Sequence, residues 1–484
     1  MIKDNNMIFE KCNDTLSSHS IELINSPENI LKGIPAGMLR KDLGGIPDIS
    51  ENEVVRHYIG LSNLNFGVDT GFYPLGSCTM KYNPKINERI ANLNEFTNIH
   101  PYSDTDRAQG SLEVLYKCKQ SLLEITGMDD MALSPCAGAH GELAGLYIIR
   151  AYFKDKKDNR SIVLVPDAAH GTNPASASMA GFKTVTVKSD ESGFVCLDDL
   201  RSKVNDQVAA FMLTNPNTLG QYEKQIGEIS KICKAHDIQL YYDGANLNAI
   251  LGISRPGDTG FDVVHLNLHK TFSTPHGGGG PGSGPVGVKK HLADFIPNKI
   301  VEFDGKKYSF KGFASKTIGQ IRAFYANFSV ILKAYTYIVS LGGEGLRKTG
   351  YYALLNANYL ACKLKNHFEL AGEDHVMHEF VISLSKECKE YGLTVVDFAK
   401  RILDYGYHAP TMSFPLIVHD CLMIEPTETE SKNTLDAFAE VMIKIAQEAK
   451  SNPELLRNAP VSTPIKRPDD VKAARTPVVR YAKT

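Results

Sequence analysis

The amino-acid sequence predicts an α/β fold, built on a mainly parallel sheet with helices on both faces. Between residues 111 and 290, short apolar segments alternate with longer segments of helical spacing. The apolar segments are almost continuously hydrophobic, which is typical of parallel strands buried on both faces. The expected helices cover residues 111–126, 141–153 and 224–236, and the expected strands cover residues 161–166, 182–187, 208–213, 238–242, 261–266 and 286–289.

The chain on either side of this alternation predicts two further parts. Residues 1–110 lack the alternation and contain turn-rich segments, so we interpret them as an N-terminal arm with a few short helices. Residues 111–319 are expected to form a large domain, and residues 320–484 a smaller α+β domain with a tail rich in proline and basic residues. A chain of 484 residues has room for two or three domains. The smaller domain is expected to contain helices at 320–340, 351–368 and 434–449 and strands at 379–383 and 412–418.

The composition argues against several kinds of partner and site. The chain has 53 basic and 55 acidic residues, so it lacks the basic excess that nucleic-acid or membrane binding usually needs. No apolar run reaches the roughly 18 residues of a membrane span, and the polar start precedes no apolar signal segment. A cytoplasmic location is therefore expected. Nine scattered cysteines without a Cys-x-x-Cys pair argue against a disulfide framework, and the roles of Cys78 and Cys136 stay open.

An aspartate and a lysine follow two expected strands. Asp243 comes directly after the strand at 238–242, and Lys270 comes soon after the strand at 261–266. Their separation of 270 − 243 = 27 residues spans one connection and one strand. Because ligands of parallel sheets bind beyond the carboxyl ends of the strands, both side chains are expected to face one crevice.

Pyridoxal phosphate (PLP) needs these two groups. An amine must hold its aldehyde as a Schiff base, and a carboxylate must keep its pyridine nitrogen protonated. The alternatives are a solvated surface lysine for Lys270 and an ordinary turn aspartate for Asp243. The position of Lys270 after an apolar strand and before four consecutive glycines favours the cofactor site.

Three further segments are candidates for the same site. Residues 134–141 form a loop of mostly small residues that leads into a helix, and the free N–H groups at such a helix start bind anions. Gly138, Ala139 and His140 are therefore candidates for contact with the phosphate, although a plain helix start is the alternative. His170 follows the strand at 161–166 and is a candidate to stack on the pyridine ring, with a capping or core histidine as the alternative; Ala245 is small enough to lie under the other face.

Two other patterns are rejected. Residues 282–287 match the G-x-G-x-x-G pattern, but Pro285 and Val286 do not open a helix, so the strand–turn–helix context of a dinucleotide site is absent. His269 and His276 have no carboxylate or thiolate between them to complete a metal site, so no metal is expected.

Four segments of the chain are long and specific: FYPLGSCTMK at 72–81, AHGTNPAS at 169–176, YDGANLN at 242–248 and LHKTF at 268–272. They resemble the P-protein family of the glycine cleavage system. More closely, they resemble subunit 2 of its two-subunit bacterial form, the lysine-bearing subunit of glycine dehydrogenase (decarboxylating). The resemblance extends from about residue 30 to about residue 430.

The resemblance implies a fold type I PLP-dependent enzyme in which Lys270 forms the Schiff base, Asp243 contacts the pyridine nitrogen and His170 stacks on the ring. It implies a heterotetramer of two copies each of this chain and a homologous subunit 1 that lacks the lysine. The implied reaction is decarboxylation of glycine, with release of CO2 and transfer of the aminomethyl group to the lipoyl arm of the H protein. Asp243 would stabilise the released electrons electrostatically. His100, Tyr102 and Thr274 are candidates for the substrate pocket, and ordinary loop structure is the alternative.

Three rival functions remain open from the sequence. Another fold type I PLP enzyme, such as an amino-acid decarboxylase, aldolase or aminotransferase, would share the same fold, because fold does not set the reaction. A non-catalytic binding subunit is the second rival, and the intact Lys270 argues against it. A dinucleotide-binding dehydrogenase rests only on the rejected glycine pattern.

Overall fold

A computed structural model describes residues 7–11, 32–39, 47, 49–190, 193–277 and 282–480. The chain divides into two compact units: Met1–Gly67 with Ser462–Thr484, and Val68–Val461. The described elements of the first unit are η1 (Ile8–Glu10), η2 (Ala36–Met38), α2 (Glu51–Ser62) and α16 (Asp470–Arg475). Helix α2 begins at a capping box, in which Ser50 and Glu53 satisfy each other's backbone N–H groups.

The second unit is built on a seven-stranded sheet with the order β1-β7-β6-β5-β4-β2-β3. Strands β3, β2, β4, β5 and β6 are parallel, and β7 pairs antiparallel with both β6 and β1. The predicted mainly parallel α/β sheet is thus confirmed. The strands are β1 (Asp130–Ala132), β2 (Ile162–Pro166), β3 (Lys183–Val187), β4 (Val208–Thr214), β5 (Gln239–Gly244), β6 (Val263–Leu266) and β7 (Val286–Val288).

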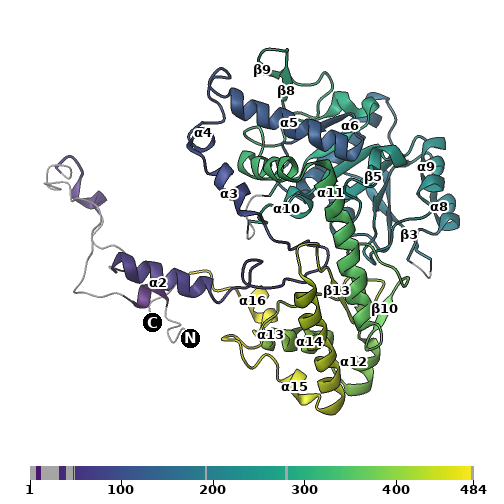
Figure 1. Cartoon of the computed structure of the whole chain (residues 1–484). Coiled ribbons are helices and arrows are strands. Elements are labelled where there is room, and N and C mark those ends of the chain that lie inside the picture. Colours follow the sequence, from purple (N-terminus) through teal and green to yellow (C-terminus); the bar gives the residue numbers. More distant parts are fainter. Residues whose placement is uncertain are drawn as a thin grey trace. The chain divides into compact units, whose positions relative to one another are not determined.

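Helices cover both faces of this sheet (Figure 1). Alternate residues of β4 enter two different cores, Phe211 and Leu213 on one face and Ala210 and Met212 on the other. Helix α6 packs on the face of Met212, while α5, α9 and the start of α11 pack on the face of Phe211. The helices before and around the sheet are α3 (Lys85–Ala91), α4 (Asn94–Thr97), α5 (Gln109–Thr126), α6 (Gly138–Asp155), α7 (Thr172–Met179), α8 (Leu197–Lys203), α9 (Ile226–Ala235), η3 (Pro256–Thr259), α10 (Leu268–Thr271) and η4 (Lys290–Phe295).

A smaller antiparallel sheet follows, with the order β10-β11-β13-β12. Its core contains Phe380 from β11, Phe398 from α13 and Phe438 from α14. The elements are β10 (Glu369–Ala371), β11 (Phe380–Ser383), α12 (Ser385–Tyr391), α13 (Val395–Asp404), β12 (Thr411–Met412), β13 (Cys421–Ile424), α14 (Lys432–Ser451) and α15 (Glu454–Arg457). A separate hairpin pairs β8 (Ile300–Phe303) with β9 (Tyr308–Lys311).

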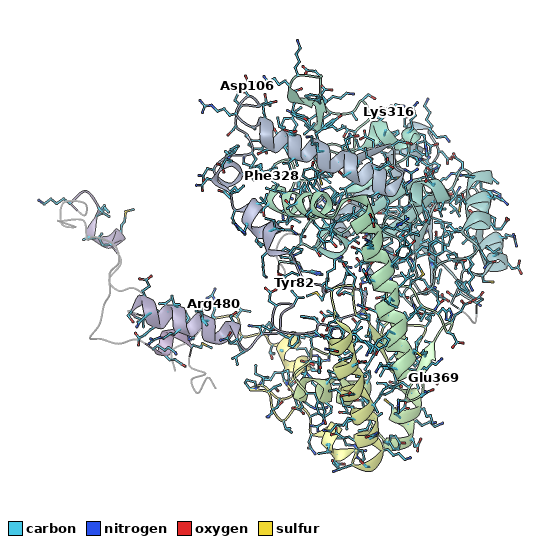
Figure 2. All side chains as sticks on the ribbon, in the orientation of Figure 1. Tyr82, Asp106, Lys316, Phe328, Glu369 and Arg480 are labelled. Atoms are coloured by element: carbon cyan, nitrogen blue, oxygen red, sulfur yellow. The ribbon has the colours of Figure 1, made fainter. Side chains whose placement is uncertain are left out.

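Helix α11 (Phe328–Leu364) joins the two cores of the second unit. It begins at Phe328, labelled in Figure 2, and contributes Ile331 to the core of the large sheet. Its far end contributes Leu360 and Leu364 to the core of the smaller sheet. Gly342 interrupts it with a φ of 63°, a left-handed conformation that glycine adopts without steric cost.

The structure corrects several predicted elements. Residues 320–327 are not helical, and the gap expected between 340 and 351 is only a kink at Gly342 within α11. The strand expected at 412–418 is only β12, because Pro415 has no N–H to donate to a ladder. Strands β1, β8, β9, β10 and β13 were not predicted. The division at residues 110 and 319 stays a prediction. Within the described ranges, no helix is both long and apolar enough to cross a membrane.

Candidate active site

A cavity of about 670 Å³ lies at the carboxyl ends of β4, β5 and β6. The cavity is where a parallel sheet is expected to bind its ligand. Its walls include Ser77, Gly138, Ala139, Glu142, His170, Thr172, Thr214, Asp243, Ala245, His265, Asn267, Lys270, His378 and Glu379. It therefore brings together six of the predicted cofactor residues.

Asp243 is a buried carboxylate held by several donors. Its Oδ2 accepts from Nδ2 of Asn173 at 3.0 Å, and its Oδ1 accepts from the backbone N–H of Ala245 at 3.0 Å. Burial raises the pKa of Asp243, but the His265 imidazole and these hydrogen bonds outweigh burial, so the pKa lies below its usual range. Asp243 is thus an anion that faces the cavity at neutral pH.

His265 is the functional neighbour that sequence reasoning missed. Its Nε2 lies 3.2 Å from Oδ1 of Asp243, and its Nδ1 lies 3.0 Å from the hydroxyl of Tyr241. The parallel register pairs Asp243 with His265 on adjacent strands, which brings the two side chains together. The signal in the sequence was a histidine inside an otherwise apolar strand.

Lys270 lies in the short helix α10, directly beyond the end of β6. Its Nζ donates to the backbone carbonyl of Ser77 at 2.7 Å. The next residue is fixed on both sides, since the Thr271 hydroxyl accepts from the Leu247 N–H at 2.9 Å and its carbonyl accepts from Nζ of Lys81 at 2.8 Å. The amine of Lys270 is therefore presented to the cavity from a well-anchored helix.

His170 is oriented by Thr172. Its Nδ1 accepts from the Thr172 backbone N–H at 3.3 Å and lies 3.0 Å from the Thr172 hydroxyl, which donates to Oε2 of Glu142 at 3.0 Å. Burial lowers the pKa of His170, which favours a neutral ring protonated at Nε2. A neutral, oriented imidazole in the cavity wall fits the predicted stacking role.

The start of α6 supplies an anion site in the same cavity. Gly138 and Ala139 line the wall, and the first N–H groups of this 18-residue helix have no acceptor one turn earlier. A Cβ at residue 138 would lie 2.1 Å from Oδ1 of Asn267, so only glycine fits there. His140 does not line the cavity; its Nδ1 lies 3.2 Å from Sγ of Cys136.

These residues fit PLP. The anionic Asp243 can hold a protonated pyridine nitrogen, Lys270 offers the amine, and the start of α6 offers N–H groups to the phosphate. Oδ1 of Asn267, buried beside Gly138, has no hydrogen-bond partner among the described residues. A polar ligand in this cavity would satisfy it.

The three residues predicted for the substrate pocket lie elsewhere. His100 lines a different cavity of about 580 Å³ with Phe96 and Phe328. Tyr102 is exposed, and its hydroxyl accepts from the N–H of Phe324 at 3.0 Å. Thr274 is fully buried and does not line the Lys270 cavity.

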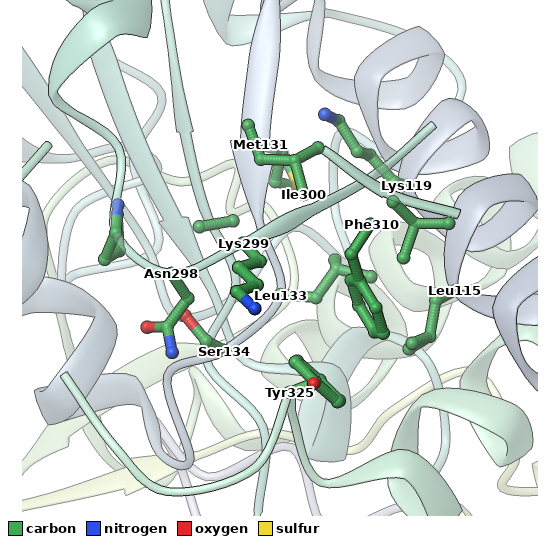
Figure 3. Close-up of a pocket in the computed structure, with 13 residues that line it drawn as sticks. Leu115, Lys119, Met131, Leu133, Ser134, Asn298, Lys299, Ile300, Phe310 and Tyr325 are labelled. Atoms are coloured by element: carbon green, nitrogen blue, oxygen red, sulfur yellow. The ribbon is translucent and has the colours of Figure 1, made fainter. Parts of the chain in front are cut away.

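Figure 3 shows a third cavity, of about 400 Å³, beside the edge strand β1. Its walls are mainly apolar, with Leu115, Met131 and Phe310 among them, and Lys299 and Ser134 add polar groups. None of the residues predicted to hold the cofactor lines it. The chemistry is therefore assigned to the Lys270 cavity.

Comparisons with known proteins agree with this geometry. Residues 349–460 match the family described as the glycine dehydrogenase C-terminal domain, and residues 114–403 match the beta-eliminating lyase family. The chain is 54% identical to a probable glycine dehydrogenase (decarboxylating) subunit 2 of Caldanaerobacter subterraneus subsp. tengcongensis, over 100% of both chains. It is 53% identical to the protein of that name from Halalkalibacterium halodurans, over 100% of this chain and 99% of the relative.

Solved structures share the fold. An inhibitor-bound glycine decarboxylase (P-protein) of the glycine cleavage system matches with a TM-score of 0.72 and 19% identity, over 87% of this chain and 95% of that one. A glutamate decarboxylase of Lactobacillus brevis matches with a TM-score of 0.65 and 13% identity, over 86% of this chain and 96% of that one. The predicted fold type I architecture is confirmed, and PLP is the cofactor that this fold and family imply. The high identity over the full length shows that the chain belongs to the glycine dehydrogenase (decarboxylating) subunit 2 family.

Proposed function

We propose that this chain is the lysine-bearing catalytic subunit of a glycine decarboxylase. The observation that carries the proposal is that the Lys270 amine and the buried carboxylate of Asp243 line the same cavity. The family's name supplies the reaction, which is decarboxylation of glycine. The aminomethyl group then passes to the lipoyl arm of the H protein.

When bound, PLP supplies an electron sink for the charge that is released as CO2 leaves. Lys270 would anchor the cofactor through its amine, which the Ser77 carbonyl holds at the cavity wall. Asp243 keeps a proton on the pyridine nitrogen because its own pKa is held low. His265 and Asn173 fix the orientation of that carboxylate, and Thr172 fixes the ring of His170.

The proposal includes partners and a location. The name of the family implies at least one further subunit. We propose a homologous subunit 1, in a heterotetramer of two copies of each chain, with lipoylated H protein as the acceptor. The cytoplasm is the proposed location.

The test is exchange of labelled bicarbonate into the carboxyl group of glycine. Purified chain, PLP, subunit 1 and lipoylated H protein are combined, and label in glycine is measured. Exchange that requires lipoylated H protein and fails with glutamate in place of glycine is the expected result. Decarboxylation, aldol cleavage or transamination without H protein would instead favour another PLP enzyme of this fold.

Replacing Asp243 by asparagine is expected to slow this exchange about 100-fold or more, because a neutral amide cannot keep the pyridine nitrogen protonated. The exchange rate at saturating PLP measures the effect. Asp262→Asn is the matched control, since Asp262 accepts a hydrogen bond from Leu240 at 2.9 Å and precedes β6 at the opposite end of the sheet. Equal rates for the two variants would remove Asp243 from the mechanism.

A further inference from the structure

A turn from the N-terminal part of the second unit is joined to the smaller sheet. Leu75 forms a β-bridge with Ile424, and the N–H of Gly76 donates to the Met423 carbonyl at 3.2 Å. The Gly76 carbonyl accepts from the hydroxyl of Thr411 at 2.7 Å. A Cβ at residue 76 would lie 2.3 Å from Cγ of Met423, so this close approach requires glycine. The backbone of Leu75 and Gly76, which leads into the turn at 77–79, is therefore held against the smaller sheet.

The two outer residues of this turn adopt a conformation that their side chains disfavour. Ser77 has a φ of 67° and Thr79 a φ of 46°, both in the left-handed region. A β-branched residue such as Thr79 is a marked outlier there. Such conformations persist only where the surroundings enforce them, and they gather at functional sites.

Two buried carboxyl groups enforce this turn. Oε2 of Glu379 accepts from the Ser77 N–H at 2.6 Å, and Oε2 of Glu425 accepts from the Thr79 N–H at 3.0 Å. Asn246 donates to Oε1 of Glu425 at 3.0 Å. Glu379 and Glu425 are 4% and 0% exposed, and their hydrogen bonds to Ser77 and Thr79 join residues more than 300 positions apart. Both carboxyl groups belong to the smaller-sheet part of the chain.

The same turn holds the amine of Lys270, since the Ser77 carbonyl accepts from Nζ at 2.7 Å. The backbone of Ser77 thus donates one hydrogen bond to Glu379 and accepts one from Lys270. We propose that Glu379 and Glu425 are positioning residues that hold the 77–79 turn and thereby aim the Ser77 carbonyl at Lys270. The inference deepens the proposed function by assigning residues that prepare Lys270 to receive PLP.

The charge state of the pair adds a pH dependence. Burial raises the pKa of Glu425 to about 7, and burial and the neighbouring Glu425 raise the pKa of Glu379 well above its usual value. A carboxylate accepts at both oxygens, but a protonated carboxyl group gives up part of this capacity. The hold on Thr79 should therefore weaken as the pH falls through about 7. The groups that face the pair are Cys78 of the turn, Lys270 of α10, His378 before β11, and Asn246 and Thr79.

The first test follows covalent attachment of PLP to Lys270. Apoprotein is mixed with PLP, reduced with borohydride at timed intervals, and the adduct on Lys270 is quantified by mass spectrometry. Glu379→Gln and Glu425→Gln are each expected to slow attachment about tenfold, because the amide weakens the buried hydrogen bond that the carboxyl group makes to the turn. The wild-type rate should change near pH 7, and Glu425→Gln should remove that change.

The matched control is Glu223→Gln. Glu223 is also buried and accepts from the backbone N–H groups of Val195 and Gln225, both at 2.9 Å, and it does not line the Lys270 cavity. Attachment in this variant should stay within about twofold of wild type, because no contact of Lys270 changes. Slowing equal to that of Glu379→Gln would show a general effect of buried carboxyl loss and overturn the proposal.

The second test uses apoprotein alone. Hydrogen exchange of the peptide covering 75–82 should speed up in Glu379→Gln and Glu425→Gln but not in Glu223→Gln. In addition, Glu379→Gln should slow attachment less when Ser77 is glycine, because glycine adopts the left-handed conformation without being held. The positioning role is overturned if hydrogen exchange of this peptide is unchanged and Glu379→Gln slows PLP attachment equally with serine or glycine at residue 77. Absence of any PLP adduct on wild-type Lys270 would instead contradict the proposed function, and the hydrogen-exchange result would still test the hold on the turn.

Discussion

Lys270→Ala is expected to eliminate both covalent PLP binding and glycine–bicarbonate exchange, with the exchange rate falling by about 10³-fold or more. The Lys270 amine donates only to the Ser77 carbonyl among the hydrogen bonds of the described residues, so it has no buried ion pair whose loss would unfold the protein. The variant should therefore fold and keep a cavity that has lost its anchor. Visible absorbance, and mass spectrometry after borohydride reduction, measure the loss.

A matched control distinguishes loss of the PLP anchor from loss of a lysine charge elsewhere on the protein. Lys289 also donates to a backbone carbonyl, that of Gly127 at 2.9 Å, but it lies beyond β7 and outside the cavity. Lys289→Ala should retain the adduct on Lys270 and most of the exchange. An adduct on another lysine in Lys270→Ala, with exchange preserved, would show that Lys270 is not the anchor.

The site residues that directly follow strands were predicted from the sequence. Those that lie within a strand or on a helix were missed. Asp243 and Lys270 could be found because a polar residue after an apolar strand lies at the edge where ligands bind. His265 stands out as a histidine inside an apolar strand, but its partner could not be predicted, because the contact depends on the register that pairs it with Asp243. Glu142 points inward from α6, and a carboxylate on an otherwise apolar helix face gives no indication of its partner.

Long-range contacts set the limit of the sequence prediction. Glu379 and Glu425 contact a turn more than 300 residues away, which no local pattern encodes. The opposite error occurred at residues 320–327, where helical spacing was present but the helix begins only at Phe328. The family and fold predictions are confirmed, whereas the roles of His100, Tyr102 and Thr274 stay predictions that the described cavity does not support.

Lys81 is the buried cation that joins the parts of the second unit. Its Nζ forms an ion pair with Glu428 at 2.7 Å and donates to Oδ1 of Asn248 at 2.9 Å and to the carbonyl of Thr271 at 2.8 Å. The side chains of Lys81 and Glu428 are 1% and 9% exposed. The next residue, Tyr82, is labelled in Figure 2 and shows where Lys81 lies in the second unit. Because Thr271 follows Lys270, the hydrogen bond from Lys81 to Thr271 also supports helix α10, which carries Lys270.

Lys81→Met is expected to lower the free energy of unfolding by about 3–5 kcal/mol, because it leaves the charge of Glu428 buried without a counter-charge. Burial lowers the pKa of Lys81, but Glu428 outweighs burial and raises it above its usual value. A lysine with a raised pKa contributes stability that is present below the pKa of the unfolded chain and is lost as pH rises through the pKa of the folded chain. The loss should therefore be constant between pH 6 and 9, and urea unfolding of the apoprotein measures it.

Two variants make this prediction specific. Lys85, the first residue of α3, pairs with Asp69 at 2.5 Å, but both side chains are 55% exposed, so Lys85→Met should cost at most about 1 kcal/mol. Adding Glu428→Gln to Lys81→Met should recover part of the stability, because the second change removes the unpaired charge. Equal costs for Lys81→Met and Lys85→Met would mean that burial of the ion pair does not matter. No recovery in the double variant would mean that Lys81 acts through its contacts with Asn248 and Thr271 rather than through the charge of Glu428.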